Sequence, residues 1–297
     1  MVYASWNEDA ATSRCTSVID VLRASGYRSQ SVVVDNSGRT RTEIAGPSGS
    51  TIIPGTNSSW EFSAYDEGRA WLSERAAPAL WLFLNDRFDA GSANALSLLS
   101  PASLRAVRDT RVLAGVVDRG PPDVTLFGAP VTRWVKSNFF MLSDRSLRRV
   151  APIAEWTEPS FRRLLPLEAP PSWRSDRADA SLAASELDAS WTAWIAEWLT
   201  GQTGRLSIHW YGAKPPEELA WELFRGKVRG ILNEHRLTQR AEASGLAVLP
   251  LRLAGRIGAH PGSRLSLRLA PKATGRILEN PKVSKAAALL RRTGQPD

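Results

Sequence analysis

The sequence is poor in the residues that build disulfide frameworks and metal clusters. Its 297 residues include one cysteine, Cys15, and three histidines. A single cysteine excludes a disulfide framework and a zinc site built from several cysteines. The histidines lie far apart in the chain and form no HExxH pair, so a zinc-protease site is not predicted; they are His209, His235 and His260.

Long hydrophobic runs are also lacking. No stretch of 18 or more uninterrupted apolar residues occurs, so no transmembrane helix is predicted. The first residues, MVYASWNEDAATSR, contain neither the basic segment nor the apolar segment of a secretory signal. We therefore expect a soluble, cytoplasmic protein.

Several common sequence motifs are missing. The chain has no GxxxxGK[ST] phosphate loop and no GxGxxG after a strand, which argues against ATPases and dinucleotide-dependent dehydrogenases. A GxSxG elbow is absent, which argues against an α/β-hydrolase. Without a zinc-finger, RNP or basic-zipper signature, nucleic-acid binding would depend on charge alone, and we do not predict it.

The positive charge of the chain is unevenly distributed. The formal net charge is +8, carried by 32 arginines and only six lysines. Residues 201–297 have a net charge of +10, whereas residues 1–200 have −2. Basic residues near an anionic membrane each contribute about 1 kcal/mol to binding. We therefore expect the basic residues of 201–297 to contact one of two partners. One is the anionic inner face of a membrane, and the other is a phosphate-bearing lipid-linked acceptor.

The first half of the chain alternates predicted strands and helices. Continuous β-branched or apolar runs with polar ends are typical of strands buried on both faces, as in a parallel sheet. Strands are predicted at 2–5, 31–38, 51–53, 79–87, 111–118 and 133–143, and helices at 10–25 and 63–74. This alternation predicts an α/β fold with a mostly parallel central sheet flanked by helices.

The second half is predicted to be largely helical. Residues 151–180, rich in Pro, Arg and Trp, read as a long loop, and helices are predicted at 185–199, 216–237 and 281–292. Gly226 and Gly230 are expected to break the second of these. We place a catalytic domain at 1–200 and a basic, largely helical extension, packed on it, at 201–297.

Polar residues follow two of the apolar strands. Asp35 and Asn36 end one, and Asn85, Asp86 and Arg87 end another. Ligands of open α/β sheets bind outside the carboxyl ends of the strands. Asp35 could accept hydrogen bonds from a ribose or base. Asp86 could bind a cation that bridges a diphosphate, or Arg87 could neutralise the diphosphate directly.

Four segments in this order resemble glycosyltransferases of the GT-A fold, family-2 type, in the bacterial polysaccharide (rhamnan-synthesis-like) branch. A "VVVDN"-type turn is matched by residues 33–36, and a "G-x-N…(D/E)-F-x-A-(Y/W)-x-x-G" segment by residues 55–68. An "LLLND-D" strand end is matched by residues 82–86, and a "W-x-(K/R)-S-x-F-F-x-(L/I)-S" segment by residues 134–143. The resemblance covers about residues 2–200.

The resemblance implies transfer of a sugar from a nucleotide-diphosphate donor to a hydroxyl of a polysaccharide or lipid-linked glycan, with inversion. It implies a donor site formed by residues at the strand ends and in the loop between them, namely Ser5, Asp35, Asn57, Glu61, Asn85, Asp86 and Arg87. It places Trp134, Lys136 and Ser137 at the acceptor site.

One position departs from the family pattern. Where the family carries its usual metal-ligating acid, this chain has Arg87. Asp86 could still bind Mn²⁺ or Mg²⁺, alone or with Asp89. A fixed guanidinium also suits phosphate geometry, which would make a metal unnecessary. The sequence leaves both alternatives open.

An inverting transfer needs a base to take the proton of the attacking hydroxyl. In the family this base lies in an "E-D-x-D" motif at the start of a helix, and residues 185–188 match it best. Glu186 then takes the base position and Asp188 is the second choice. Acids at a helix start also serve as caps, which is the structural alternative. Asp144, Glu155 and Glu158 are reserve candidates.

Two other functions remain open. Arg87 favours a non-catalytic glycan-assembly or carbohydrate-binding protein that retains the fold. A nucleotidyltransferase would also place acids at strand ends, but the chain lacks the glycine- and lysine-rich loop expected near the first strand.

Overall fold

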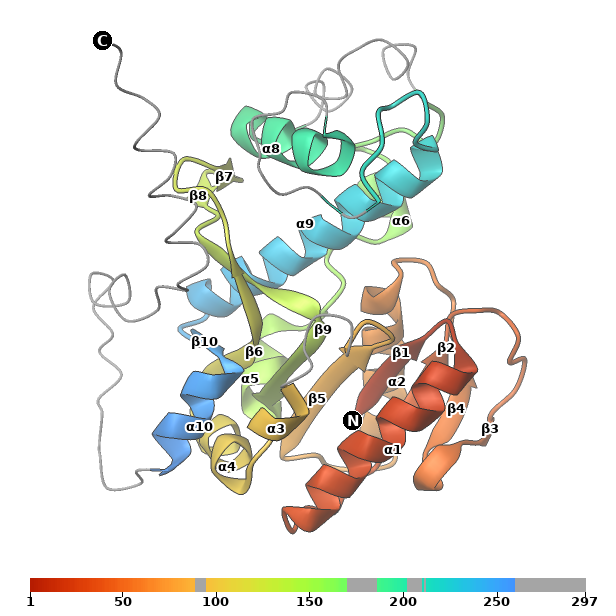
Figure 1. The fold of residues 1–297 in the computed structure, drawn as a ribbon, viewed down its shortest axis with the longest axis vertical. Coiled ribbons are helices and arrows are strands. Elements are labelled where there is room, and N and C mark those ends of the chain that lie inside the picture. The colour runs from red at the N-terminus through yellow and green to blue at the C-terminus, as the bar shows by residue number, and fades with distance from the viewer. Residues whose placement is uncertain (89–94, 170–185, 202–209, 211, 260–297) are drawn as a thin grey trace, which may run out of the picture. The chain divides into compact units, whose positions relative to one another are not determined.

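An eight-stranded mixed sheet forms the centre of the protein in the computed structural model (Figure 1). Its strand order is β10-β6-β9-β5-β1-β2-β4-β3. The strands are β1 Val2–Ser5, β2 Val32–Asp35, β3 Ile44–Ala45, β4 Thr51–Pro54, β5 Leu80–Asn85, β6 Val112–Arg119, β9 Arg133–Ser143 and β10 Ala247–Pro250. Two of them, β3 and β9, run antiparallel to their neighbours, and the other pairings are parallel.

The structure describes residues 1–88, 95–169, 186–201, 210 and 212–259. Residues Met1–Ala259 make up one compact unit. The helix predicted at 281–292 and the candidate ligand Asp89 lie outside the described residues.

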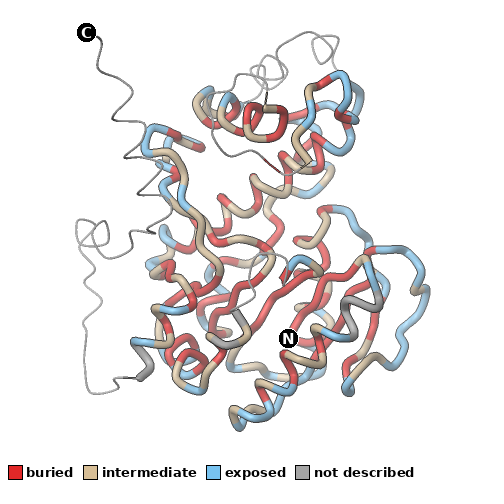
Figure 2. Tube along the Cα trace, in the orientation of Figure 1, coloured by how far each residue is buried: buried red, intermediate tan, exposed pale blue. Residues whose placement is uncertain are grey.

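Helices cover both faces of the sheet. On one face, α1 (Glu8–Ala24), α4 (Pro101–Asp109) and α10 (Leu251–Ala259) bury apolar side chains in one core cluster, with the short α3 (Ala95–Leu98) beside them. On the other face, α2 (Glu61–Ser73), α5 (Asp144–Val150) and α9 (Trp221–Ala243) contribute to a second cluster. Figure 2 shows the strands as the most continuously buried part of the chain. This layering is the predicted α/β architecture, with a mixed and mostly parallel sheet.

A third core cluster lies away from the sheet, where α8 (Ala189–Thr200) packs beside the first half of α9 (Figure 1). A small hairpin, β7 (Thr125–Leu126) and β8 (Ala129–Pro130), and the short helix α6 (Glu158–Phe161) complete this region. Trp191 is fully buried, and Trp194 and Trp198 pack partly buried against the same cluster. The tryptophan stripe of α8 is therefore part of a hydrophobic core.

The apolar runs of the sequence form strands, because their side chains can be buried on both faces of the sheet. All four residues of β2 are buried, and its β-branched valines suit a pleated surface enclosed by helices. Close helix packing depends on Gly68 in α2, because a Cβ there would collide with Val2 of β1 and approach Val34 of β2. The first half of the sheet and its covering helix are thus fitted at the level of single side chains.

Some predicted elements have the observed bounds and others differ. The strand predicted at 133–143 agrees with β9. The helix predicted to start at residue 185 begins at Ala189. The predicted break at Gly226 and Gly230 is wrong: α9 runs unbroken from Trp221 to Ala243 because tertiary packing outweighs the weak helix propensity of glycine. Residues 201–259, assigned from sequence to an extension, supply α9 and also β10, which is hydrogen-bonded to β6 within the sheet.

Across the described residues, no helix combines the length and the apolar character needed to cross a membrane.

Candidate functional site

The polar residues predicted at strand ends meet at one edge of the sheet. Ser5 of β1 pairs with Asp35 of β2, and Ala4 pairs with Asn85 of β5. The chain leaves β1 on one side to form β2 and β4, and later returns on the other side as β5. Such a reversal of strand order opens a crevice at the carboxyl ends, the usual ligand position in open α/β sheets. The structure therefore brings Ser5, Asp35, Asn85 and Asp86 to one edge.

Asp86 holds the connection between β1 and α1. Its Oδ2 accepts hydrogen bonds from the backbone N–H groups of Trp6 at 2.6 Å and Asn7 at 3.0 Å. Its Oδ1 accepts from the Ser5 hydroxyl at 3.3 Å. The guanidinium of Arg14 donates to its main-chain oxygen. Every oxygen of this residue thus has a donor, so the contacts of Asp86 shape the loop.

Asp35 organises the turn after β2 in a similar way. Its carboxylate accepts from the N–H of Ser37 at 2.8 Å and from the N–H of Thr40 at 2.7 Å. Burial raises the pKa of Asp35, but the hydrogen bonds from Ser37 and Thr40 outweigh burial, so the net effect lowers the pKa. Asp35 is therefore an anion at neutral pH and retains lone pairs that further donors could use.

The described residues do not fit a divalent cation at Asp86. N–H and O–H donors already surround its carboxylate, and the next residue is Arg87. In the part of the chain that the structure covers, no three His, Cys, Asp or Glu side chains come together as a metal-binding group. A Mn²⁺ or Mg²⁺ ion needs several free oxygen ligands.

The loop between β4 and α2 carries backbone strain. Asn57 is exposed and has a φ of 52°, and Trp60, just before α2, has a φ of 55°. Positive φ is costly for residues other than glycine and persists where surrounding contacts impose it, as at ligand sites. The carbonyl of Trp60 accepts from the amide of Asn36 at 3.0 Å and from the Ser63 hydroxyl at 2.9 Å. These bonds fix Trp60, and with it Glu61 at the start of α2.

Lys227 of α9 lies between two indole rings. Its Nζ is 4.7 Å from the centre of the Trp60 ring and 5.1 Å from that of Trp210. Within the described residues no hydrogen bond or ion pair reaches this ammonium group. Burial and, to a smaller extent, the nearby charge of Arg87 lower the pKa of Lys227 to about 8, against the opposing effect of Glu61 and Glu234. Two cations thus approach each other without a carboxylate in ion-pair contact with Lys227.

A glutamate pair shares one serine beside Lys227. The Ser137 hydroxyl is 2.6 Å from Oε1 of Glu61 and 2.7 Å from Oε1 of Glu234, which also accepts the Ser137 N–H at 2.6 Å. Tyr65 donates to the Ser137 carbonyl at 2.6 Å. Burial raises the pKa of Glu234 to about 7; Glu61 adds to the rise, and the bonds from Ser137 oppose it. We call Trp60, Glu61, Ser137, Lys227 and Glu234 the Lys227 cluster.

Strand register places Ser137 of the Lys227 cluster at the carboxyl edge of the sheet, where Asp35 and Asp86 also lie. Phe139 of β9 pairs with Leu84 of β5, and β9 runs antiparallel. Ser137, two residues earlier in β9, therefore lies beyond the carboxyl end of β5, where Arg87 also follows. Strand ends, the strained loop and α9 meet at this edge.

The other two predicted acceptor residues are engaged elsewhere. The Trp134 ring centre is 4.7 Å from that of His235 and 5.5 Å from that of Trp194, within the third core cluster. Lys136 forms an ion pair with Asp118 at 3.1 Å. Of the three predicted acceptor residues, Ser137 is the one whose hydrogen bonds lie within the cluster.

The predicted bases Glu186 and Asp188 lie next to α8. Glu186 is exposed, and Asp188 precedes the first helical residue. Oδ2 of Asp188 accepts from the N–H of Gly128, in the turn between β7 and β8, at 3.1 Å. The structure therefore does not bring these two acids to the Lys227 cluster; they belong to the region of α8 and the small hairpin (Figure 1).

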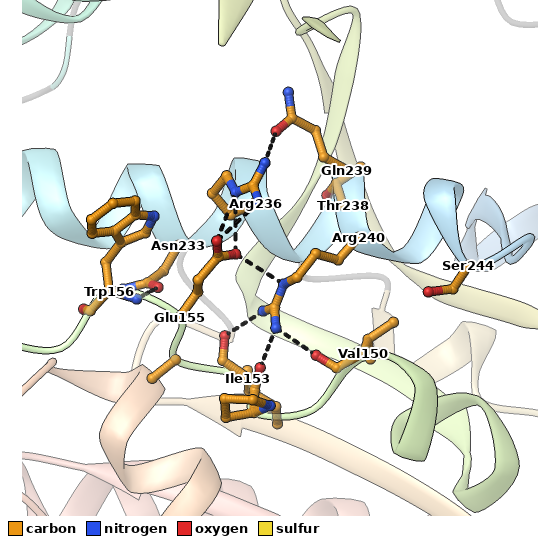
Figure 3. A network of polar contacts seen from close by, with 12 residues as sticks. Val150, Ile153, Glu155, Trp156, Asn233, Arg236, Thr238, Gln239, Arg240 and Ser244 are labelled. Carbon is orange, nitrogen blue, oxygen red and sulfur yellow. Dashed lines mark hydrogen bonds and ion pairs between the residues drawn. The ribbon is translucent and has the colours of Figure 1, made fainter. Parts of the chain in front are cut away.

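The reserve acids form structural ion pairs. Asp144 accepts from the Trp81 indole at 3.0 Å, and Glu158 pairs with Arg225 at 2.7 Å. Glu155 binds Arg236 at 2.9 Å and Arg240 at 3.1 Å, and Figure 3 shows this network joining α9 to the segment after α5. The contacts of Glu155 and Glu158 anchor α9, and that of Asp144 joins α5 to β5.

Asn233 completes that anchor one residue before Glu234. Its side chain accepts from the N–H of Trp156 at 2.8 Å and donates to the carbonyl of Trp156 at 3.1 Å (Figure 3). Asn233 is fully buried, so these two bonds satisfy both ends of its amide. The position of Glu234 along α9 is therefore well determined.

Sequence reasoning missed Lys227, Glu234 and Trp60. The sequence of α9 gave little signal, because Arg225, Arg229 and His235 are also polar and buried, and Lys227 and Glu234 do not stand out among them. Nothing in the local sequence shows that Trp60 covers α9. The chain was also compared with family models, with curated proteins and with solved structures, and no match was found in any of the three comparisons.

Proposed function

We propose that the protein is a glycosyltransferase that moves a sugar from a nucleoside-diphosphate donor to a hydroxyl of a polysaccharide or lipid-linked glycan, with inversion. Two independent features support this. Residues 33–36, 55–68, 82–86 and 134–143 resemble the GT-A family. The mostly parallel sheet reverses its strand order beside β1, where open α/β sheets bind their ligands.

The observation that carries the proposal is the environment of the Lys227 ammonium group. Its ammonium group is largely removed from water, lies between two indole rings, and makes no ion pair within the described residues. The positive charge of Arg87 is close enough to lower its pKa. A buried ammonium group without an ion-pair partner is unfavourable unless an anion joins it. A diphosphate carries the charge and the oxygens that would satisfy Lys227, and the charge of Arg87 would add to the attraction.

In this proposal, Lys227 and Arg87 hold the diphosphate and balance the charge that develops on it as the sugar departs. Fixed cations aimed at a developing charge are an effective form of transition-state stabilisation. No metal ion is then needed for this task. The nucleoside lies toward β2, where the anionic carboxylate of Asp35 accepts hydrogen bonds from the ribose or base.

Loops built by other strand-end residues shape the donor site. Asp86 and Ser5 fix the loop between β1 and α1 through hydrogen bonds to Trp6 and Asn7. Asn57 lies exposed in the strained loop before α2. Asn85 accepts from the N–H of Arg87 at 3.0 Å and so orients the residue that would face the diphosphate.

Thermal-shift and calorimetric titration with UDP, GDP and dTDP test the proposal. Wild-type protein is expected to be stabilised by at least one of them, and equally with Mn²⁺ or with a chelator. Lys227→Met should weaken that binding at least tenfold, because it removes the charge but retains much of the side-chain volume. Lys214→Met, the same change at an exposed lysine, is the matched control and should have no effect.

Absence of binding by every nucleoside diphosphate would overturn the donor site. Binding that is unchanged in Lys227→Met would overturn the role of the lysine. Binding that requires Mn²⁺ would show that a cation, with ligands beyond those described, shares the task.

The non-catalytic alternative is favoured by the contacts of Asp86, whose carboxylate is committed to backbone donors. It predicts nucleotide or glycan binding without release of nucleoside diphosphate from any donor sugar. Measuring that release directly distinguishes the two functions.

A further inference from the structure

The hydroxyl of Ser137 lies between two carboxyl groups. It is 2.6 Å from Oε1 of Glu61 and 2.7 Å from Oε1 of Glu234. A serine hydroxyl has one proton and can donate to only one of them. The second short contact is favourable when the other carboxyl carries a proton and donates to the serine oxygen. The three side chains therefore share one proton beyond the serine's own.

Burial decides where that proton resides. Glu234 is half-buried, and the loss of solvent around its carboxyl group raises its pKa to about 7, so it is the group that holds the proton at or below neutral pH. In this protonated state Oε1 of Glu234 still accepts the Ser137 N–H and donates its proton to the Ser137 oxygen, and the Ser137 hydroxyl donates to Glu61. The carboxyl group of Glu61 is thus oriented by the hydrogen bond from Ser137. Within the described residues, the side chain of Glu61 makes no other hydrogen bond or ion pair, so its second carboxyl oxygen, Oε2, is available.

We propose that Glu61 is the proton acceptor for the hydroxyl that attacks the sugar, and that Ser137 and Glu234 are its positioning residues. This proposal rests on the proposed function and assigns the base that it requires. It places the base on α2, at the strained Trp60 junction and beside Lys227, instead of at Glu186 near α8.

The step balances in protons and electrons. The acceptor hydroxyl loses its proton to the free oxygen of Glu61, and its oxygen forms a bond to the anomeric carbon. The bond from that carbon to the diphosphate oxygen breaks, and its electron pair leaves with the nucleoside diphosphate. Lys227 and Arg87 balance the new negative charge. With water as acceptor the same step yields free sugar and nucleoside diphosphate.

Charged and titratable groups from three elements face Glu234. They are Glu61 and Tyr65 of α2, Lys136 of β9 and Lys227 of α9 itself. Above pH 7, Glu234 ionises and competes with Glu61 for the Ser137 proton. Glu61 then loses its orienting bond, so the rate is expected to fall as pH rises through about 7.

The test compares the full-length wild type with Glu61→Gln, Glu234→Gln and Ser137→Ala. The donor probes are UDP-glucose, GDP-mannose and dTDP-rhamnose, with water as acceptor. Calorimetry gives donor affinity, and single-turnover release of nucleoside diphosphate gives the rate from pH 5 to 9. Glu222→Gln, at an exposed position of the same helix, is the control and should match the wild type.

The donor affinity of Glu61→Gln should lie within about twofold of that of the wild type. Its rate of nucleoside-diphosphate release should be lower by at least about a hundredfold, the usual contribution of a general base. Glu234→Gln stays neutral, so it should retain release and lose the fall near pH 7. Ser137→Ala should reduce the rate and also lose that fall. A purely structural role for Glu234 would leave the pH profile unchanged.

The outcomes separate the two proposals. If no donor binds the wild type, the proposed function fails. If the wild type binds donor and releases no nucleoside diphosphate, the proposed enzymatic function fails and the donor site stands. If the wild type releases nucleoside diphosphate and Glu61→Gln releases it at the same rate, the assignment of Glu61 fails and the proposed function stands. Carbon-13 NMR of labelled glutamate gives a readout independent of activity, because a carboxyl titrating near pH 7 should be present in wild type and absent in Glu234→Gln.

Discussion

Glu234 and Lys227 are two ionisable side chains of one helix, α9, that the fold removes from water. Burial shifts their pKa values in opposite directions, to about 7 for the acid and about 8 for the base. Both shifts favour the neutral form of the side chain. Pairs of groups with perturbed pKa values in one place are typical of functional sites, although structural networks produce them too.

The raised pKa of Glu234 predicts a pH-dependent cost to stability. Below its ordinary value of 4.5 the group is protonated in both the folded and the unfolded chain. Between 4.5 and about 7 the unfolded chain ionises first, so wild-type stability falls as pH rises. Glu234→Gln should therefore become more stable than wild type across this range, by up to about 3 kcal/mol above pH 7. Urea unfolding at pH 4.5, 6, 7 and 8 measures the difference; a difference that does not vary with pH would contradict it.

The lowered pKa of Lys227 predicts that anion binding weakens in mild alkali. The ammonium form binds a diphosphate, and the free protein loses that form as pH rises through about 8. The affinity for UDP or GDP should therefore decline between pH 7 and 9.5. Lys227→Met should bind weakly with little dependence on pH in this range. Titration calorimetry in buffers of different ionisation enthalpy should also detect proton uptake on binding near pH 8.5, and no uptake would contradict the prediction.

Helix α9 is the element that joins the sheet, the strained loop and the third core cluster. Trp60 packs against it at Gly226, where an added Cβ would be 2.5 Å from the indole ring. At Gly230 the nearest atom is at 3.9 Å, which is an ordinary contact. The two glycines of one helix therefore have different roles: Gly226 makes room for Trp60, and Gly230 does not.

This difference predicts opposite effects of the same substitution. Gly230→Ala should stabilise the protein by about 0.5–1 kcal/mol, because alanine favours the helix. Gly226→Ala should destabilise it by about 1–3 kcal/mol, because the indole must shift, and it should weaken nucleoside-diphosphate binding by moving Trp60 away from Lys227. Urea unfolding and calorimetry check both variants. If Gly226→Ala proved as stable as Gly230→Ala, Trp60 would not be held as described.

At the scale of the whole molecule, the positive charge is unevenly distributed along the chain. The sheet and its helices occupy Met1–Ala259, and much of the basic excess lies in the C-terminal third of the chain. Residues 281–297 contain four basic residues and one acid. Each basic residue near an anionic lipid surface contributes about 1 kcal/mol, and salt screens the attraction.

We expect the basic end to mediate contact with an anionic membrane surface. Deletion of 281–297 should lower binding to phosphatidylserine-containing vesicles at least tenfold, whereas binding to neutral phosphatidylcholine vesicles should be weak for both proteins. Thermal unfolding of the compact unit should not change. Vesicle sedimentation at low and high salt is the measurement, and equal binding of the shortened chain, or binding insensitive to salt, would argue against the membrane contact.

The sequence by itself determined the elements whose signal is local. The valines of β2 and the apolar run of β5 predicted buried strands, and their polar ends predicted the ligand edge, because side-chain burial on both faces leaves a continuous apolar pattern. The residues of β9 were predicted with the observed bounds. Asp35 and Asp86 lie at the carboxyl ends of β2 and β5, as predicted, although their hydrogen bonds to backbone N–H groups could not be foreseen.

Only the tertiary structure decided which side chains share a site. Ser137 contacts Glu61, 76 positions away, and Glu234, 97 positions away, and no local pattern specifies such pairs. The same holds for Lys227, whose partners Trp60 and Trp210 come from separate loops. Burial then sets the protonation of Glu234 and Lys227, because desolvation depends on everything packed around a group and not on its neighbours in the chain.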